Sequence, residues 1–181
     1  MFFLRKSTLE RLPVVMSGVR MGERALQIGI DDSDLVGAIA AKVGLSGQAA
    51  VVVTEERDAN KVRGAAARAG ALVDVQVAPL DALPFADDAF DVVVLHAAGL
   101  KSVQAGSQSV SILRDALRVL RGGGRVVIIE GSGSGLMTRL RPARVDTAGT
   151  LSALDAAGFT ATRLLAEREG YAFLEGLKRG T

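Results

Sequence analysis

Short apolar runs recur along this chain, and segments with helical spacing of their apolar residues separate most of them. The runs occupy residues 24–30, 49–54, 73–77, 90–96 and 125–130. Most are continuously apolar and rich in valine or isoleucine, which is typical of strands that are covered on both faces. Strands that alternate with helices predict an α/β fold, with a mostly parallel sheet between two layers of helices.

The predicted helices lie between these runs, and glycines close them. They occupy residues 35–43, 59–69, 109–120 and 151–157, followed by Gly44, Gly70, a glycine turn at 122–124 and Gly158. Glycine is favoured there because the residue after a helix often adopts a left-handed conformation. The acidic turn at 31–34 can cap the first of these helices, and the turn at 55–58 holds capping candidates for the second.

Two further strand candidates follow the last helix, at residues 159–165 and 171–177. The polar segment 167–170 separates them at the spacing of a hairpin. A hairpin at the end of an alternating pattern adds an antiparallel strand to the sheet. We therefore predict a Rossmann-like, doubly wound α/β domain, with a mostly parallel seven-stranded sheet and a C-terminal antiparallel strand hairpin.

The length of 181 residues fits one domain with a single sizeable core. Residues 1–21 combine a short helical pattern with a proline break at Pro13, which is expected of a lead-in segment packed on the edge of a domain. Residues 22–181 carry all the predicted strands, so we expect them to form the domain itself.

The residue types that are missing exclude several kinds of site. Without cysteine the chain has no disulfide, thiolate metal site or cysteine nucleophile, and a single histidine rules out a histidine-rich metal cluster. With 22 basic and 20 acidic residues, the charge is too balanced to indicate nucleic-acid binding. No apolar run approaches the roughly 18 residues of a membrane span, and the N-terminus lacks the order of a signal peptide. We expect a cytoplasmic protein.

Several phrases of the sequence match one family of enzymes. Leu83-Pro84-Phe85 before an acidic turn, followed by Phe90 and the residues after it, resembles "LPF…FDVV", and residues 117–130 resemble "RVLKPGGRLVLVE". Residues 154–159 resemble "LLEEAGF". With the order of elements, these phrases resemble the class I S-adenosylmethionine-dependent methyltransferases from about Gly22 to the end of the chain. The resemblance implies their Rossmann-like fold and transfer of a methyl group from S-adenosylmethionine.

The resemblance also implies that three loops at the carboxyl ends of strands hold this cofactor. The residues that it assigns are Gly29, Ile30 and Asp31 for the methionine end, Glu55 or Glu56 for the ribose, and Leu80, Asp81, Ala82 and Leu83 for the adenine. The acceptor of the methyl group would lie beside them, at the same edge of the sheet.

All three loops depart from the family's patterns. The first motif, "LDVGCGTG", aligns with residues 26–33, where Gly29 is the one glycine kept and Asp31 and Asp32 add bulk and charge. An ungapped alignment places Val53 where the family has its ribose-binding acid, and the residues at 78–79 replace its adenine-binding "GD" pair. These degenerate motifs indicate altered or lost cofactor binding.

His96 is the candidate catalytic residue. It ends the central strand, at the edge where open α/β sheets bind ligands, so it could act as a general base or stack on the adenine side. The alternative is a polar side chain that is satisfied at a strand end.

Two charged groups have open roles. Asp31, Asp32 and Asp34 could ligate a hard cation, but helix capping is the simpler interpretation, and we predict no metal site. The arginines at 139, 141 and 144 either contact an acidic substrate or partner, or form a solvated loop face.

Two functions therefore compete. The first is a methyltransferase that uses S-adenosylmethionine and acts on an unknown small-molecule or protein acceptor. The second is a non-catalytic protein of the same fold that acts by association, as a homodimer or as a scaffold for a partner. A dinucleotide oxidoreductase ranks last, because residues 29–34 lack the G-x-G-x-x-G fingerprint.

Overall fold

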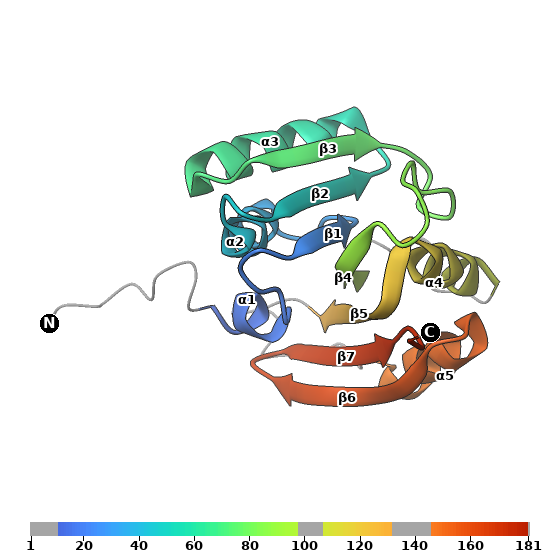
Figure 1. The fold of residues 1–181 in the computed structure, drawn as a ribbon. Helices are drawn as coiled ribbons and strands as arrows, with labels where there is room; N and C mark the ends of the chain where they lie inside the picture. The colour runs from blue at the N-terminus through green and yellow to red at the C-terminus, as the bar shows by residue number, and fades with distance from the viewer. Residues whose placement is uncertain (1–10, 98–106, 132–145, 181) are drawn as a thin grey trace, which may run out of the picture.

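Seven strands form one sheet in the part of the chain that the computed structural model describes, residues 11–97, 107–131 and 146–180 (Figure 1). They are β1 (Arg24–Ile28), β2 (Gln48–Val53), β3 (Val73–Val77), β4 (Phe90–His96), β5 (Leu120–Gly131), β6 (Thr160–Arg168) and β7 (Tyr171–Leu177). Their order is β3-β2-β1-β4-β5-β7-β6. The first five run parallel, and β7 is antiparallel to both of its neighbours. The predicted sheet with its C-terminal antiparallel hairpin is confirmed.

The order of the strands reverses beside β1, and this reversal positions the site. The chain moves outward from β1 to β2 and β3, then crosses back to place β4 on the other side of β1. At such a reversal the connections leave toward opposite faces of the sheet, and a crevice opens at the carboxyl ends of the strands. Ligands of open α/β sheets bind in that crevice.

Helices cover both faces of the sheet. Those in the described residues are α1 (Leu12–Met16), α2 (Ser33–Val43), α3 (Glu56–Ala69), α4 (Ser107–Val119) and α5 (Thr147–Ala157). The first three pack on one face, and α4 and α5 on the other (Figure 1). Alternate residues of β4 enter the two cores: Val92 and Val94 pack with α1 and α2, whereas Val93 and Leu95 pack with α4 and α5. Because β4 is buried on both faces from Val92 to Leu95, those residues are all apolar.

The structure differs from the predicted helices at their starts. α2 begins at Ser33 rather than at 35, and α4 begins at Ser107 rather than at 109. α3 begins at Glu56 rather than at 59, because an acidic first turn is favoured at a helix N-terminus. α5 begins at Thr147 rather than at 151, and Asp146 caps it by accepting from the N–H of Gly149. Pro13 does not break a helix but lies in the first turn of α1, where a residue needs no N–H partner.

The predicted glycine turn lies inside β5 rather than before it. Leu120 pairs with Phe90, and the next pair is Arg125 with Val92, so β5 advances from 120 to 125 while β4 advances from 90 to 92. The glycines form a bulge in that interval, and Gly123 adopts a φ of +74° that favours glycine.

α2 and α3 approach each other so closely at Gly37 that only glycine fits. A Cβ atom there would lie 2.9 Å from the carbonyl oxygen of Ala65 in α3 and 3.0 Å from its carbonyl carbon. Backbone atoms cannot rotate away from such a contact as a side chain can. Gly64 in α3 is different, because the nearest atom to a Cβ there would be Nη1 of Arg68, at 3.5 Å.

We expect Gly37→Ala to lower the free energy of unfolding by about 1–3 kcal/mol, because overpacking outweighs the gain in helix propensity. The matched change Gly64→Ala should raise it by about 0.5–1 kcal/mol, since the added methyl group meets only a flexible side chain. Urea titrations of both variants measure whether the free energy of unfolding falls or rises. Stabilisation by Gly37→Ala would contradict the close contact between α2 and α3.

One polar pair is buried where β1, β4 and α2 meet. His96 is 1% exposed, and its Nε2 lies 3.0 Å from Oε1 of Gln27, which is also 1% exposed. The Nε2 of Gln27 donates to the carbonyl oxygen of Val36 in α2, at 2.9 Å. Burial lowers the pKa of His96 to about 4, although the charge of Asp32 acts in the opposite direction. His96 is therefore neutral in the folded protein at pH 7.

Acid should destabilise the fold through His96. The ordinary pKa of this side chain is 6.5 and its pKa in the folded protein is about 4, so between these values the unfolded chain binds the proton more readily. On this account the free energy of unfolding should fall by about 3 kcal/mol between pH 7 and pH 4. Urea titrations across this range should show the loss in the unchanged protein, and His96→Phe should lack that part of it.

Glu130 also contributes to the pH dependence of stability, but its contribution cancels when the two proteins are compared. Burial raises the pKa of Glu130, so its contribution has the opposite sign, but it is the same in both proteins. The difference between the two pH profiles therefore isolates His96. Equal slopes in the two proteins would show that the histidine is not held neutral by burial.

Candidate functional site

The carboxyl ends of four parallel strands meet at one edge of the sheet, where backbone contacts join the loops that follow them. The N–H of Gly29, just after β1, donates to the carbonyl oxygen of Val52 in β2 at 2.9 Å. The N–H of Ala78, just after β3, donates to the carbonyl oxygen of Val53 at 3.0 Å. A Cβ atom at Gly29 would lie 3.4 Å from the carbonyl oxygen of His96, at the end of β4. The structure thus brings the three predicted loops and His96 to one edge.

The first loop turns at Gly29 and leads directly into α2. Gly29 has a φ of +75°, in the left-handed region that favours glycine. Ile30 packs against the apolar residues between β2 and the helices, whereas Asp31 is exposed. Oδ1 of Asp32 accepts hydrogen bonds from two backbone N–H groups in the first turn of α2, at 2.9 and 3.3 Å. The capping interpretation of this acidic turn is confirmed.

Arg11 supplies a positive charge to this loop. Its Nη2 lies 2.7 Å from Oδ2 of Asp32, and the two side chains are 32% and 41% exposed. Burial alone would raise the pKa of Asp32, but the hydrogen bond and the charge of Arg11, together with the two backbone N–H groups, hold it below its ordinary value. Asp32 is therefore ionised and paired. Arg11 could not be predicted as part of the site, because it precedes the first strand in the predicted lead-in segment.

Two glutamates follow β2, and their partners differ. β2 ends at the buried Val53. Glu55 occupies the N-cap of α3 without a capping hydrogen bond, and Arg57 lies 3.3 Å from its carboxylate. The carboxylate of Glu56 lies 2.5 Å from Arg63 on α3. Exposed pairs of this kind are weak, so a ligand could displace Arg57 from Glu55, the glutamate that precedes the helix.

The third loop is fixed to α4. Its buried residues are Leu80 and Leu83, and its exposed residues are Asp81 and Ala82. The N–H of Leu83 donates to Asp115 at 2.5 Å, and Arg118 donates to the carbonyl oxygen of Leu83 at 3.0 Å. Hydrogen bonds with Asp115 and Asp87 raise the pKa of Arg118. Arg118 lies in the phrase that resembles the family, but the sequence did not reveal this contact.

Other predicted groups fall outside this edge or outside the described residues. The arginines at 139, 141 and 144 lie outside the described residues. In the three described ranges, no group of three or more histidine, aspartate or glutamate side chains is placed to hold a metal ion. The helices in those ranges are all too short or too polar to cross a membrane.

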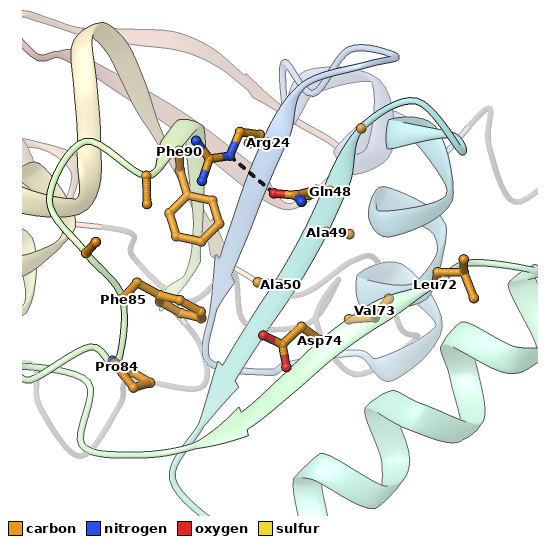
Figure 2. Close-up of a pocket in the computed structure, with 13 residues that line it drawn as sticks. Arg24, Gln48, Ala49, Ala50, Leu72, Val73, Asp74, Pro84, Phe85 and Phe90 are labelled. Atoms are coloured by element: carbon orange, nitrogen blue, oxygen red, sulfur yellow. Dashed lines mark hydrogen bonds between the residues drawn. The ribbon is translucent and has the colours of Figure 1, made fainter.

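A separate groove lies at the opposite edge of the sheet, where β1, β2 and β3 begin (Figure 2). Its volume is about 700 Å³, and its lining includes Arg24, Gln48, Asp74, Phe85 and Phe90. Nε of Arg24 donates to Oε1 of Gln48 at 3.3 Å, and the rings of Phe85 and Phe90 meet edge to face with centroids 5.0 Å apart. None of the predicted site residues lines this groove, so it is distinct from the candidate site.

Comparisons with known proteins identify relatives of this chain. The model of the ubiE/COQ5 methyltransferase family matches residues 6–143. The "Ubiquinone/menaquinone biosynthesis C-methyltransferase UbiE" of Ectopseudomonas mendocina is 35% identical over 128 residues, which cover 70% of this chain and 48% of that protein. The chain thus spans about half the length of the curated relatives it matches.

Solved structures share the fold at low identity. A SAM-dependent methyltransferase from Aquifex aeolicus aligns with a TM-score of 0.71 and 16% identity, over 91% of this chain and 86% of that one. The [4+2]-cyclase SpnF aligns with a TM-score of 0.65 and 19% identity, over 94% of this chain and 79% of that one. The fold alone therefore does not specify methyl transfer. The match over residues 6–143 and the 35% identity show that the chain belongs to the ubiE/COQ5 family of S-adenosylmethionine-dependent methyltransferases.

Proposed function

We propose that this protein transfers a methyl group from S-adenosylmethionine to a ring carbon of a hydroquinone-like compound. Its family and the names of its relatives, C-methyltransferases of ubiquinone and menaquinone biosynthesis, support this acceptor. The reduced form of a quinone is an electron-rich ring that offers a carbon nucleophile. Its carbon would form the new bond to the methyl group as the bond from that group to sulfur breaks, and the ring would then lose the proton from the same carbon. The observation that carries the proposal is the meeting of three loops where the strand order reverses, the place where this kind of sheet binds ligands.

The residues at this edge fit the parts of the cofactor. Gly29 carries no side chain, so a ligand can approach the backbone of the first loop beside the end of β4. The partly exposed guanidinium of Arg11 can attract the carboxylate of the methionine end. Glu55 can accept hydrogen bonds from the ribose hydroxyls, and the exposed Asp81 of the third loop can accept one from the adenine amino group.

The bound cofactor supplies a methyl group that its positively charged sulfur activates for transfer. The chain's own contribution is to hold the acceptor in line and to keep water away from the reacting atoms. His96 is neutral at pH 7 and serves there as a polar contact for the ligands rather than as a cation. We place the reaction in the cytoplasm, a reducing compartment that suits a chain without cysteine.

A non-catalytic role by association is the second candidate. The observation that favours it concerns Asp32. This side chain already accepts hydrogen bonds from two backbone N–H groups at the start of α2, and it forms an ion pair with Arg11. A helix N-terminus attracts a carboxylate ligand only through N–H groups that are not already bonded. Under this alternative the fold presents its surface to a second copy or to a partner chain.

Calorimetric titration with S-adenosylmethionine and S-adenosylhomocysteine separates the two candidates. We expect a Kd of about 1 µM or tighter, which corresponds to about 8 kcal/mol. The double variant Asp31→Gly/Asp32→Gly should bind at least as tightly, because two carboxylates no longer repel the carboxylate of the cofactor. Absence of binding by the unchanged protein would contradict the enzyme proposal, and binding gained only by the variant would locate the defect in the first loop.

The control for this experiment removes the same charge elsewhere. Glu167→Gly/Glu169→Gly alters the exposed hairpin between β6 and β7, where Glu169 already has a φ of +55°. This variant should bind the cofactor as the unchanged protein does. A gain in affinity equal to that of the first-loop variant would attribute the effect to net charge alone.

Gly29→Val should abolish measurable cofactor binding, a loss of about a hundredfold or more, because the added side chain would occupy space beside the first loop and strain its backbone. Gly70→Val is the matched control: Gly70 has a φ of +68° at the end of α3, and nothing lies within 4 Å of its Cβ position. Both variants should lose stability in urea titrations. Only Gly29→Val should lose affinity, and an equal loss in both would assign the effect to backbone strain.

A further inference from the structure

The orientation of the buried Gln27 amide is determined by its partner in α2. The carbonyl oxygen of Val36 can only accept a hydrogen bond, and it lies 2.9 Å from the amide nitrogen of Gln27. The amide oxygen of Gln27 therefore points toward His96, whose Nε2 is 3.0 Å away. An amide oxygen can also only accept, so Nε2 of His96 must carry the proton in this hydrogen bond.

The second ring nitrogen of His96 is then an acceptor. A neutral imidazole carries its proton on one nitrogen and a lone pair on the other, and the hydrogen bond at Nε2 leaves the lone pair on Nδ1. Within the described ranges, Nδ1 of His96 is the one buried side-chain nitrogen or oxygen without a hydrogen-bond partner. Buried polar atoms nearly always have a hydrogen-bond partner, so we expect a donor to bind this nitrogen.

The position of His96 indicates where that donor comes from. His96 is the last residue of β4, and its carbonyl oxygen lies beside Gly29. The negative charge of Asp32 in the first loop acts to raise the pKa of the His96 ring. These residues belong to the edge where the first loop meets the end of β4. A ligand that binds there with an N–H or O–H group can provide the hydrogen bond that Nδ1 lacks.

We propose that His96 is a positioning residue: Gln27 holds its ring as the Nε2–H tautomer, and Nδ1 accepts a hydrogen bond from an N–H or O–H group of the bound ligand. At the first loop two groups would have this chemistry, the α-ammonium group of the cofactor and a phenolic hydroxyl group of a hydroquinone. The ribose hydroxyls and the adenine amino group are also donors, but they are assigned to the second and third loops. The identity of these ligands rests on the proposed function. The tautomer is a property of the chain alone.

Nitrogen NMR tests the tautomer directly, because the chain contains a single histidine. Protein labelled with ¹⁵N-histidine, prepared without a histidine tag, gives one pair of ring nitrogens. Without ligand at pH 7, we expect Nε2 to carry the proton and Nδ1 to have the chemical shift of an unprotonated nitrogen. A protonated Nδ1, or a rapidly exchanging mixture of both tautomers, would overturn the proposal.

Three probes, added singly, identify the donor. S-adenosylhomocysteine carries the α-ammonium group, 5′-methylthioadenosine has the nucleoside without the amino-acid end, and 2-methyl-1,4-naphthohydroquinone carries phenolic hydroxyl groups. A shift of the Nδ1 resonance with the first probe but not the second assigns the ammonium group, and a shift with the third assigns the hydroxyl. An Nδ1 resonance that none of them moves overturns the ligand role of His96.

Calorimetry on the same samples separates this inference from the proposed function. If S-adenosylhomocysteine binds but Nδ1 does not respond to any probe, the positioning role is refuted and the proposed function stands. If S-adenosylhomocysteine does not bind while the hydroquinone shifts Nδ1, the cofactor proposal fails and the acceptor site remains.

Substitution of Gln27 tests whether the tautomer matters for binding. Gln27→Met keeps a similar volume but removes the amide, so both tautomers should appear and affinity for the probe that shifts Nδ1 should fall about tenfold, the size of one hydrogen bond. Gln48→Met, at the exposed start of β2, is the matched control, and it should change neither the tautomer of His96 nor the affinity for the probe. His96→Phe should show the same tenfold loss. A folded Gln27→Met variant with mixed tautomers and unchanged affinity would refute the positioning role.

Discussion

The candidate site depends on the parallel register between β1 and β4. That register places Gln27 opposite Val94, so the side chain of Gln27 and that of His96 lie on the same face of neighbouring strands. A slip of one residue would turn His96 toward the face covered by α4 and α5, because side chains alternate along a strand. The buried polar pair and the contact of Gly29 with the carbonyl oxygen of His96 both follow from this one pairing.

The first and third loops at the site are held by three different kinds of contact. A backbone hydrogen bond to β2 holds the turn at Gly29, an ion pair with Arg11 holds the start of α2, and Arg118 on α4 holds the third loop. These contacts come from the lead-in segment, the sheet and a helix on the opposite face. The shape of the edge is therefore set by the whole domain rather than by the loops themselves.

Three strands could be placed to the residue from the sequence, whereas the start of no helix could. The runs at 73–77, 90–96 and 171–177 coincide with β3, β4 and β7, because apolar runs report burial within a sheet. The starts of α3 and α5 were placed too late, since their first turns are polar or small and carry no apolar spacing. The three loops and His96 could be assigned to one edge, because parallel strands share it. Arg11, Gln27 and Arg118 could not, since their contacts span 21, 69 and 35 residues of sequence.

The position of β7 has a consequence for synthesis of the chain on the ribosome. β7 follows every other strand in the sequence, yet it lies inside the sheet, between β5 and β6. Phe173 and Leu174 are fully buried in the cores on its two faces. Until residues 171–177 emerge, β5 keeps an open edge and β6 has no strand to pair with, and such edges attract other chains. Translation that stops before β7 would leave an aggregation-prone fragment in which β5 and β6 are both unpaired on the sides that β7 would fill, not a slightly shorter domain.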